Sequence, residues 1–219
     1  MADNGGVSSS GDDYWVKIDD TLVGRKAGGS ASAKARELRA AHPVRTLAEQ
    51  TLGRTTEARA WRKGARGERF TGWLFGRLPE GWHVFNDVPI GQLGANIDHV
   101  VLGPGGVFTL NTKNRSGKVW LAPRTLLVNG IKTDYLPKAA REAARASGLV
   151  SAALGRTVPI RAVLAIVADD WAIKGQPSDV YVGSPRSVKR WFLEQAPTLL
   201  PREVNEVAAV CAKPSTWTG

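Results

Sequence analysis

Two apolar runs in the middle of the chain flank a short glycine-rich segment. They cover residues 96–102 and 107–114 and enclose Gly103-Pro104-Gly105-Gly106. Glycine and proline clusters end strands and provide turn geometry, so the simplest arrangement is an antiparallel β-hairpin. A four-residue loop that joins Leu102 to Val107 fixes which side chains face each other across this hairpin.

The predicted register puts polar side chains on one face of the hairpin. Asp98 lies opposite Asn111, and Lys113 shares their face because side chains alternate along a strand. The opposite face, where His99 neighbours Leu110, is mostly apolar. Facing residues have Cβ atoms roughly 4.5 to 5.5 Å apart, so one small cation can touch both Asp98 and Asn111.

The rest of the chain alternates between helical and strand-like patterns. Helical periodicity covers residues 30–41, 45–78, 137–154, 187–195 and 202–211. Strand-like runs occupy 82–88, 118–121, 160–168 and 180–182, and 128–133 resembles a small hairpin. Four β-like runs follow one another between 82 and 121 and predict a meander. The order predicts an α/β fold, a mixed sheet with helices on its faces and an N-terminal helical extension.

We predict three segments. Residues 1–30, rich in Gly, Ser and Asp, are a disordered or loosely docked tail in which residues 14–18 form a short strand. Residues 31–59 are a basic helical extension, and 60–219 form one domain. With 42% apolar residues and eight Trp, the chain is long enough to bury a sizeable core.

Several classes of protein are disfavoured by composition. The one cysteine, Cys211, excludes an internal disulfide framework and a multi-cysteine zinc site, and His42, His83 and His99 show no ligand spacing. No apolar run approaches the roughly 18 residues that span a bilayer, and the N-terminus lacks a signal pattern. A cytoplasmic protein is expected, with no indication of its oligomeric state.

The positive charge is concentrated in the N-terminal half. Residues 25–77 contain thirteen Lys or Arg and four Glu, out of a net charge of +10 for the whole chain. Such an excess suits a polyanion, because Lys and Arg that contact phosphates release condensed counterions. Exposed arginines on a solvated helix give the same pattern without any ligand.

Glu68 is a second acidic candidate. In the helix around residues 66–78, Gly64, Glu68 and Gly72 recur every four residues and form a stripe of small side chains. Such a stripe lets the helix approach the sheet closely and brings the carboxylate to the polar face of the hairpin. Simple packing with a solvated Glu68 is the alternative.

The residue types on the polar face of the hairpin are suited to phosphodiester hydrolysis. Asp98 can hold Mg²⁺, the metal can polarise a phosphate and lower the pKa of water, and Lys113 can orient that water or stabilise the transition state. The helix of residues 137–154 has a second polar surface, which contains Lys138, Arg141 and Glu142. This surface either contacts phosphate or is merely solvated.

Three segments together resemble the nuclease-related domain (NERD) family. They are Gly64-Ala65-Arg66-Gly67-Glu68, residues 82–88, and residues 97–108 followed by Thr112-Lys113-Asn114. The family is similar to the PD-(D/E)XK nucleases, which implies a restriction-endonuclease-like fold, a bacterial setting and DNA cleavage with Mg²⁺ or Mn²⁺. By position, the resemblance makes Glu68, Asp98, Asn111 and Lys113 the catalytic set, with Asp98, Glu68 and Asn111 as metal ligands.

One position departs from the family pattern. Asn111 stands where the motif usually has Glu, and its amide oxygen can ligate a metal but brings no negative charge. Glu68 or Glu142 can compensate, and Asp87 is a further substitute, although a strand-end polar role explains it better. The alternatives are an inactive nucleic-acid-binding module of the same fold and a protein-interaction domain.

Candidate nucleic-acid contacts come from the two basic helices. The side chains are Arg62, Lys63, Arg66, Arg69, Lys138 and Arg141. DNA is the expected partner, and no membrane is involved.

Overall fold

The computed structural model describes residues 21–41, 57–91 and 95–218. The helices are α1 (Gly29–Ala41), α3 (Glu57–Phe75), α4 (Tyr135–Leu154), α5 (Pro185–Glu194), α6 (Pro201–Cys211) and the short η2 (Pro214–Thr216). The strands are β1 (His83–Ile90), β2 (Ala95–Gly103), β3 (Gly106–Asn114), β4 (Lys118–Ala122), β5 (Thr125–Val128), β6 (Ile131–Lys132), β7 (Ile160–Val167), β8 (Asp170–Ile173) and β9 (Val180–Gly183).

The main sheet has five strands in the order β1-β2-β3-β7-β9. β2 pairs antiparallel with both β1 and β3, whereas β7 pairs in parallel with both β3 and β9. The β7 sequence IRAVLAIV is almost entirely apolar, as expected for a central parallel strand that is covered on both faces. The predicted α/β fold with a mixed sheet is therefore confirmed, as is the N-terminal helix.

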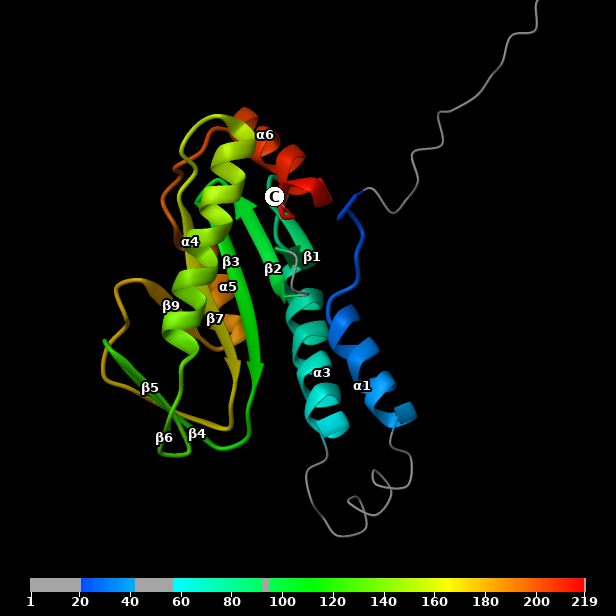
Figure 1. The fold of residues 1–219 in the computed structure, drawn as a ribbon. Coiled ribbons are helices and arrows are strands. Elements are labelled where there is room, and N and C mark those ends of the chain that lie inside the picture. Colours follow the sequence, from blue (N-terminus) through cyan, green and yellow to red (C-terminus); the bar gives the residue numbers. More distant parts are fainter. Residues whose placement is uncertain (1–20, 42–56, 92–94, 219) are drawn as a thin grey trace, which may run out of the picture.

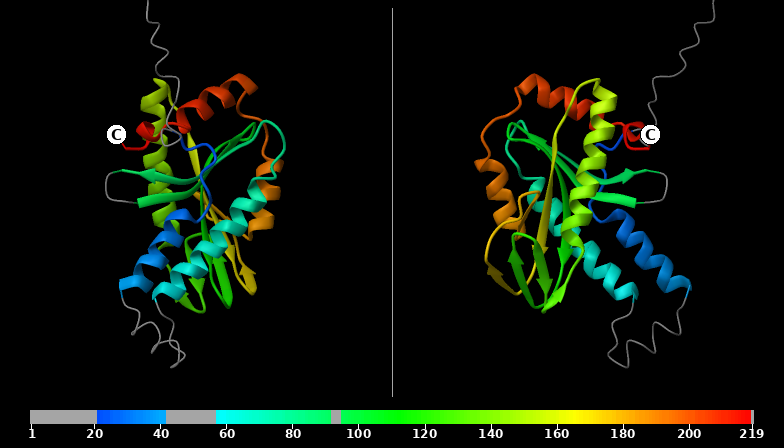
Figure 2. Two further views of the ribbon diagram at one scale, coloured as in Figure 1. Left: turned by 90° about the vertical axis from the view of Figure 1, so that its right-hand side faces the viewer. Right: turned by 60° about the vertical axis from the view of Figure 1, so that its left-hand side comes forward.

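Helices cover both faces of this sheet (Figure 1). On one face, α4 contributes Ala139, Ala143 and Val150 to a core that also contains α6 and the buried Trp217. On the other face, Phe75 of α3 and Phe192 of α5 pack in a second cluster around Phe108. Figure 2 shows α1 and α3 side by side on this second face.

A second, smaller sheet has the strand order β6-β5-β4-β8. The predicted meander is therefore wrong at residues 118–121, because β4 leaves the main sheet and β7 takes the place beside β3. The chain turns away at Gly117, whose φ of 94° favours glycine. The parallel partner of β4 is the short β8, which the sequence pattern did not predict.

Most predicted elements are confirmed with shifted ends. The small hairpin at 128–133 is β5–β6, with β5 already starting at Thr125. The helix predicted for residues 45–78 is observed as α3 from Glu57 to Phe75, and residues 42–56 lie outside the described part. The predicted strand at 14–18 also lies outside it. Within the predicted tail, Leu22 is buried and its N–H donates to the Ala212 carbonyl at 2.8 Å.

The central hairpin has the predicted register. Leu102 pairs with Val107, Val100 with Thr109 and His99 with Leu110. His99 and Leu110 are fully buried on the apolar face. The ladder ends at this pair although both strands continue, β2 toward Ala95 and β3 toward Asn114. Beyond it, β2 pairs only with β1 and β3 only with β7, so the sheet divides along a seam.

Candidate active site at the divided sheet

Asp98 lies at the beginning of the seam. Its Oδ2 accepts a hydrogen bond of 2.6 Å from the backbone N–H of Thr112. The carboxylate thus satisfies a strand N–H that the interrupted ladder leaves free, since buried backbone donors need an acceptor. This contact fixes the Asp98 side chain between the two separating strands.

A cavity of about 270 Å³ opens next to this carboxylate. Asp98, Asn111 and Lys113 all line it, so the structure brings together the three polar residues that the hairpin register predicted. Glu142 reaches the same cavity from α4, and the Asn111 side-chain amide donates a hydrogen bond to its Oε1. The cavity lining therefore includes three carboxylates, two amides and two ammonium groups, those of Asp98, Asp134, Glu142, Asn96, Asn111, Lys113 and Lys138.

Glu68 approaches from α3. It does not belong to the cavity lining, but the charges of Asp98 and Lys113 both act on its carboxyl. The helix comes close to β3 at Gly67, where a Cβ would lie 2.8 Å from Asn114 Cβ. Gly72 is similarly tight against Ala27, whereas Gly64 borders open space. The predicted stripe is therefore wrong at Gly64, because the helix face against the sheet is rotated toward Gly67.

Burial and mutual repulsion raise the pKa values of these acids. Desolvation is the main cause for Glu68 and Glu142, whose pKa values rise to about 7, and the charge of Asp98 adds to each. Burial also raises the pKa of Asp98, against the opposing effects of Lys113 and the Thr112 hydrogen bond. Acids with raised pKa values around one cavity are typical of a functional site.

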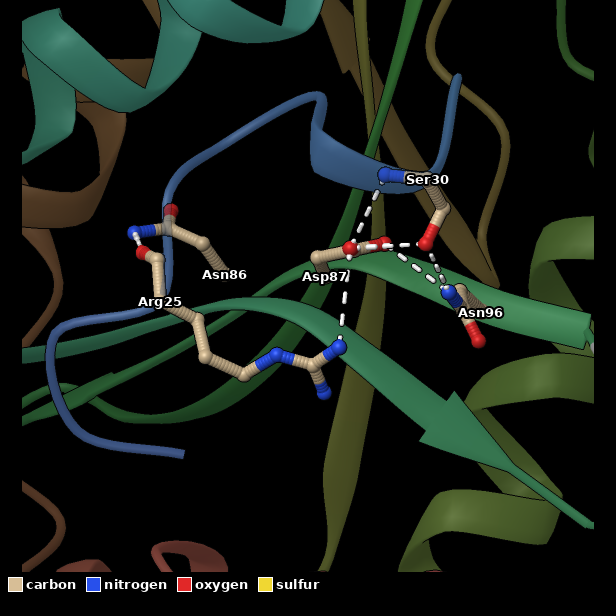
Figure 3. Close-up of polar contacts among 5 residues, drawn as sticks. All are labelled: Arg25, Ser30, Asn86, Asp87 and Asn96. Atoms are coloured by element: carbon tan, nitrogen blue, oxygen red, sulfur yellow. Dashed lines mark hydrogen bonds and ion pairs between the residues drawn. The ribbon is translucent and has the colours of Figure 1, made fainter. Parts of the chain in front are cut away.

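Asp87 lies in a separate polar network that fastens α1 to the sheet (Figure 3). Its Oδ2 accepts hydrogen bonds from the backbone N–H and the hydroxyl of Ser30, at 3.1 and 2.7 Å, and lies 3.7 Å from Arg25 Nη2. Its Oδ1 accepts from Asn96 Nδ2 at 2.9 Å. Both oxygens are engaged in structural contacts, which favours the structural interpretation of Asp87 over a ligand role.

The Asp87 network also reaches the cavity. Asn96, which donates to Asp87, is itself one of the residues that line the cavity beside Asp98. Asp87 has a φ of 53°, a left-handed conformation that is uncommon for a residue other than glycine. That conformation interrupts the pairing of β1 with β2 opposite Asp98.

The six predicted nucleic-acid contacts occupy different places. Arg62, Lys63 and Arg66 line a second, larger groove at α3, and Lys138 lines the small cavity. Arg69 donates to the Ser32 hydroxyl at 3.2 Å, and its charge lowers the pKa of Glu68. Arg141 is exposed and lines neither cavity.

Two further features are absent from the described part of the chain. No group of three or more His, Cys, Asp or Glu side chains is arranged to hold a metal ion there. None of its helices combines the length and the apolar content needed to cross a bilayer.

Comparison with known proteins identifies the class. Residues 63–167 match the nuclease-related domain (NERD) family, and this match covers α3 from Lys63 onward, β1 to β6, α4 and β7. The chain therefore contains a nuclease-related domain, and every residue of the candidate site lies within the matched range. Searches of curated proteins and of solved structures gave no match.

Sequence reasoning left three contributors out of the predicted site. The sequence predicts Glu142 only as a substitute ligand and does not indicate Tyr135 or Asn96, which also line the cavity. Tyr135 and Glu142 are seven residues apart, two helical turns, and therefore share a face of α4. That spacing is a usable signal, but nothing in the sequence shows which strand the face meets.

Proposed function

We propose that this protein hydrolyses phosphodiester bonds in DNA with Mg²⁺ or Mn²⁺, at the cavity of Asp98. The observation that carries the proposal is the convergence of Asp98, Asn111, Lys113 and Glu142 on one small cavity within a nuclease-related domain. Glu68 supports it, because its carboxyl is close enough to respond to Asp98 and Lys113.

The donor set suits a hard divalent cation. Mg²⁺ usually binds through one or two carboxylates and retains several waters, so Asp98 and Glu142 with the Asn111 amide oxygen form a sufficient set. Burial is the main cause of the raised pKa of Glu142, and repulsion from Asp98 adds to it; a cation between the two carboxylates would relieve this repulsion. Glu142 would thus bring the negative charge that Asn111 lacks.

Each side chain then has a distinct task. When bound, Mg²⁺ supplies Lewis-acid polarisation of the scissile phosphate and acidifies a water molecule. Lys113 stabilises the negative charge that builds up on the phosphoryl oxygens. Asn111 holds the Glu142 carboxylate in place through its amide N–H, and Glu68 accepts a proton from the attacking water, for which a pKa of about 7 is suitable.

Plasmid nicking tests this function. The full chain is incubated with supercoiled DNA and Mg²⁺ or Mn²⁺, beside Asp98→Asn, Lys113→Ala and a control, Lys213→Ala, which is exposed and lines neither cavity. Cleavage that requires the metal, persists in Lys213→Ala and is lost in the other two variants supports the proposal. Cleavage that survives both site substitutions eliminates this site.

A second candidate function is nucleic-acid binding without catalysis. The specific observation that favours it is the Asn111–Glu142 hydrogen bond, which gives the Glu142 carboxylate a hydrogen-bond donor without a metal. This function predicts salt-sensitive DNA binding and no turnover with any divalent metal. Gain of cleavage in Asn111→Glu would then show that only the motif carboxylate had been lost.

A further inference from the structure

A groove of about 1160 Å³ lies beside the candidate site. Its first wall is α3, its floor is the turn that follows β3, and its second wall is formed by the β5–β6 hairpin and the beginning of α4. Tyr135 lines both this groove and the cavity of Asp98. The groove and the cavity of the proposed reaction centre therefore lie next to each other and share the Tyr135 side chain.

The first wall is cationic. Arg62, Lys63 and Arg66 are exposed, and Arg62 and Arg66 lie on the same side of α3 because they are one helical turn apart. Arg115 adds a fourth positive charge from the floor, and no acidic residue belongs to the lining. Such a wall suits a row of phosphates.

The second wall is apolar and aromatic. Ile131 is 72% exposed there, an unusual state for a large aliphatic side chain, and Val128 lies beside it. The Tyr135 ring follows, with Lys113 Nζ at 5.9 Å and Arg115 Cζ at 5.6 Å from its centroid. Aliphatic and aromatic side chains of this kind contact the faces of unpaired bases.

The β5–β6 hairpin that forms this wall is fixed by its turn geometry and by hydrogen bonds of the Asn129 side chain. Asn129 and Gly130 form its two-residue turn with φ values of 52° and 79°, the conformation that an Asn-Gly turn prefers. The Asn129 side chain accepts from the Lys118 N–H at 2.9 Å and donates to the Ser116 carbonyl at 3.0 Å. The wall is therefore preorganised relative to the floor.

We propose that this groove binds single-stranded DNA and delivers it to Asp98. Phosphates lie along α3, while bases face Ile131 and stack near Tyr135. A duplex does not match the two walls, because its bases are paired and stacked inside and its phosphates would also face the apolar wall. This inference rests on the proposed function and specifies the form of its substrate.

Binding in EDTA tests the inference without catalysis. Fluorescence anisotropy of the full chain is measured with a labelled 20-nucleotide thymidine strand, a blunt 20-base-pair duplex and a 20-nucleotide uridine strand. We expect the DNA strand to bind about ten-fold tighter than the duplex and at least as tightly as the RNA. A duplex that binds equally or more tightly, or RNA that binds more tightly, overturns the proposal.

Variants of the second wall locate the contact. Ile131→Ser and Tyr135→Ala should each weaken binding of the DNA strand, Tyr135→Ala by about ten-fold, while Tyr135→Phe keeps the aromatic ring and the affinity. Ile173→Ser is the matched control, since Ile173 is 53% exposed on β8 of the same sheet and does not line the groove. Equal effects of Ile131→Ser and Ile173→Ser contradict the proposed wall.

Variants of the first wall test the phosphate contacts. The double variant Arg62→Ala/Arg66→Ala should reduce both the affinity and its dependence on salt, whereas Arg124→Ala, exposed at the turn between β4 and β5 and outside the groove, should not. Because no metal is present, a protein that fails to cleave can still pass these tests. Cleavage of plasmid by a protein that binds both DNA forms alike would leave the proposed function intact and reject this inference.

Discussion

The side-chain amide of Asn111 donates a hydrogen bond to the carboxylate of Glu142, which joins β3 to α4 inside the candidate site. Asn111, which brings no charge of its own, thus holds a carboxylate from another element. This pair makes the relocation of a negative charge directly testable.

Exchange of the side-chain types at positions 111 and 142 should show whether the negative charge of the site has moved to Glu142 or has been lost. We expect Glu142→Gln to lower metal-dependent cleavage by about 100-fold, because Asp98 is then the one carboxylate left in the proposed set of Asp98, Glu142 and Asn111. The double variant Asn111→Glu/Glu142→Gln returns the charge to β3 and should recover most of the activity. Initial nicking rates at saturating Mg²⁺ measure both effects, and undiminished activity of Glu142→Gln would remove this residue from the site.

Lys113 should act on catalysis more than on folding. Removal of one group that stabilises transition-state charge typically costs 10²- to 10³-fold in rate, and we expect Lys113→Met to fall in that range. Its thermal midpoint should stay near that of Lys132→Met, an exposed control on β6. A rate reduced less than five-fold would show that another group supplies the charge.

The stability of the protein should depend on the protonation of Glu142. Its pKa is raised from 4.5 to about 7 in the folded chain, so between these values the folded state binds more protons and stability falls as the pH rises. Glu142→Gln removes this penalty. It should exceed the wild type by at most about 3 kcal/mol at pH 8 and match it at pH 4, as measured by urea unfolding.

Two glycines of α3 provide a matched pair. Gly64→Ala should stabilise the protein by roughly 0.5–1 kcal/mol, because the site is open and alanine favours the helix. Gly67→Ala should destabilise it, since the new Cβ would lie 2.8 Å from Asn114 Cβ and 3.4 Å from Thr112 Cγ2. Chemical denaturation of both variants checks the sign, and Gly67→Ala should also slow cleavage by displacing Glu68.

Asp87 should control the attachment of α1. Asp87→Ala removes the acceptor for two hydrogen bonds from Ser30 and one from Asn96, and bonds to a charged group contribute about 1.5–3 kcal/mol each. We expect faster amide hydrogen exchange in residues 29–41, with little change in β7. Asp87→Asn tolerates the positive φ and should release α1 less.

The sequence was most informative where a short-range rule determines the geometry. The turn at residues 103–106 set the register of β2 and β3, and with it the shared face of Asp98, Asn111 and Lys113. Helix and strand periodicity likewise located most elements within a few residues. Local patterns did not reveal that β4 leaves the main sheet, because its partner β8 is distant in the chain.

Contacts between separate elements were the harder part of the site. The meeting of Glu142 with Asn111 depends on where α4 crosses β3, and the contact of Gly67 with Asn114 depends on the rotation of α3. Both are set by tertiary packing, for which a single sequence gives no direct signal. The family resemblance indicated Glu68, whereas its helical stripe indicated the wrong neighbouring glycine.

The early end of the β2–β3 ladder has a consequence for how this domain can diverge. Where the two strands separate, their backbone N–H and C=O groups lose each other as hydrogen-bond partners. Substitution of side chains does not remove these groups, which continue to require other hydrogen-bond partners. Loss of a charged side chain from one position therefore leaves a polar cavity between the strands and not a closely packed apolar core. Descendants of such a domain can exchange the donors around that cavity, one element for another, without rebuilding the fold.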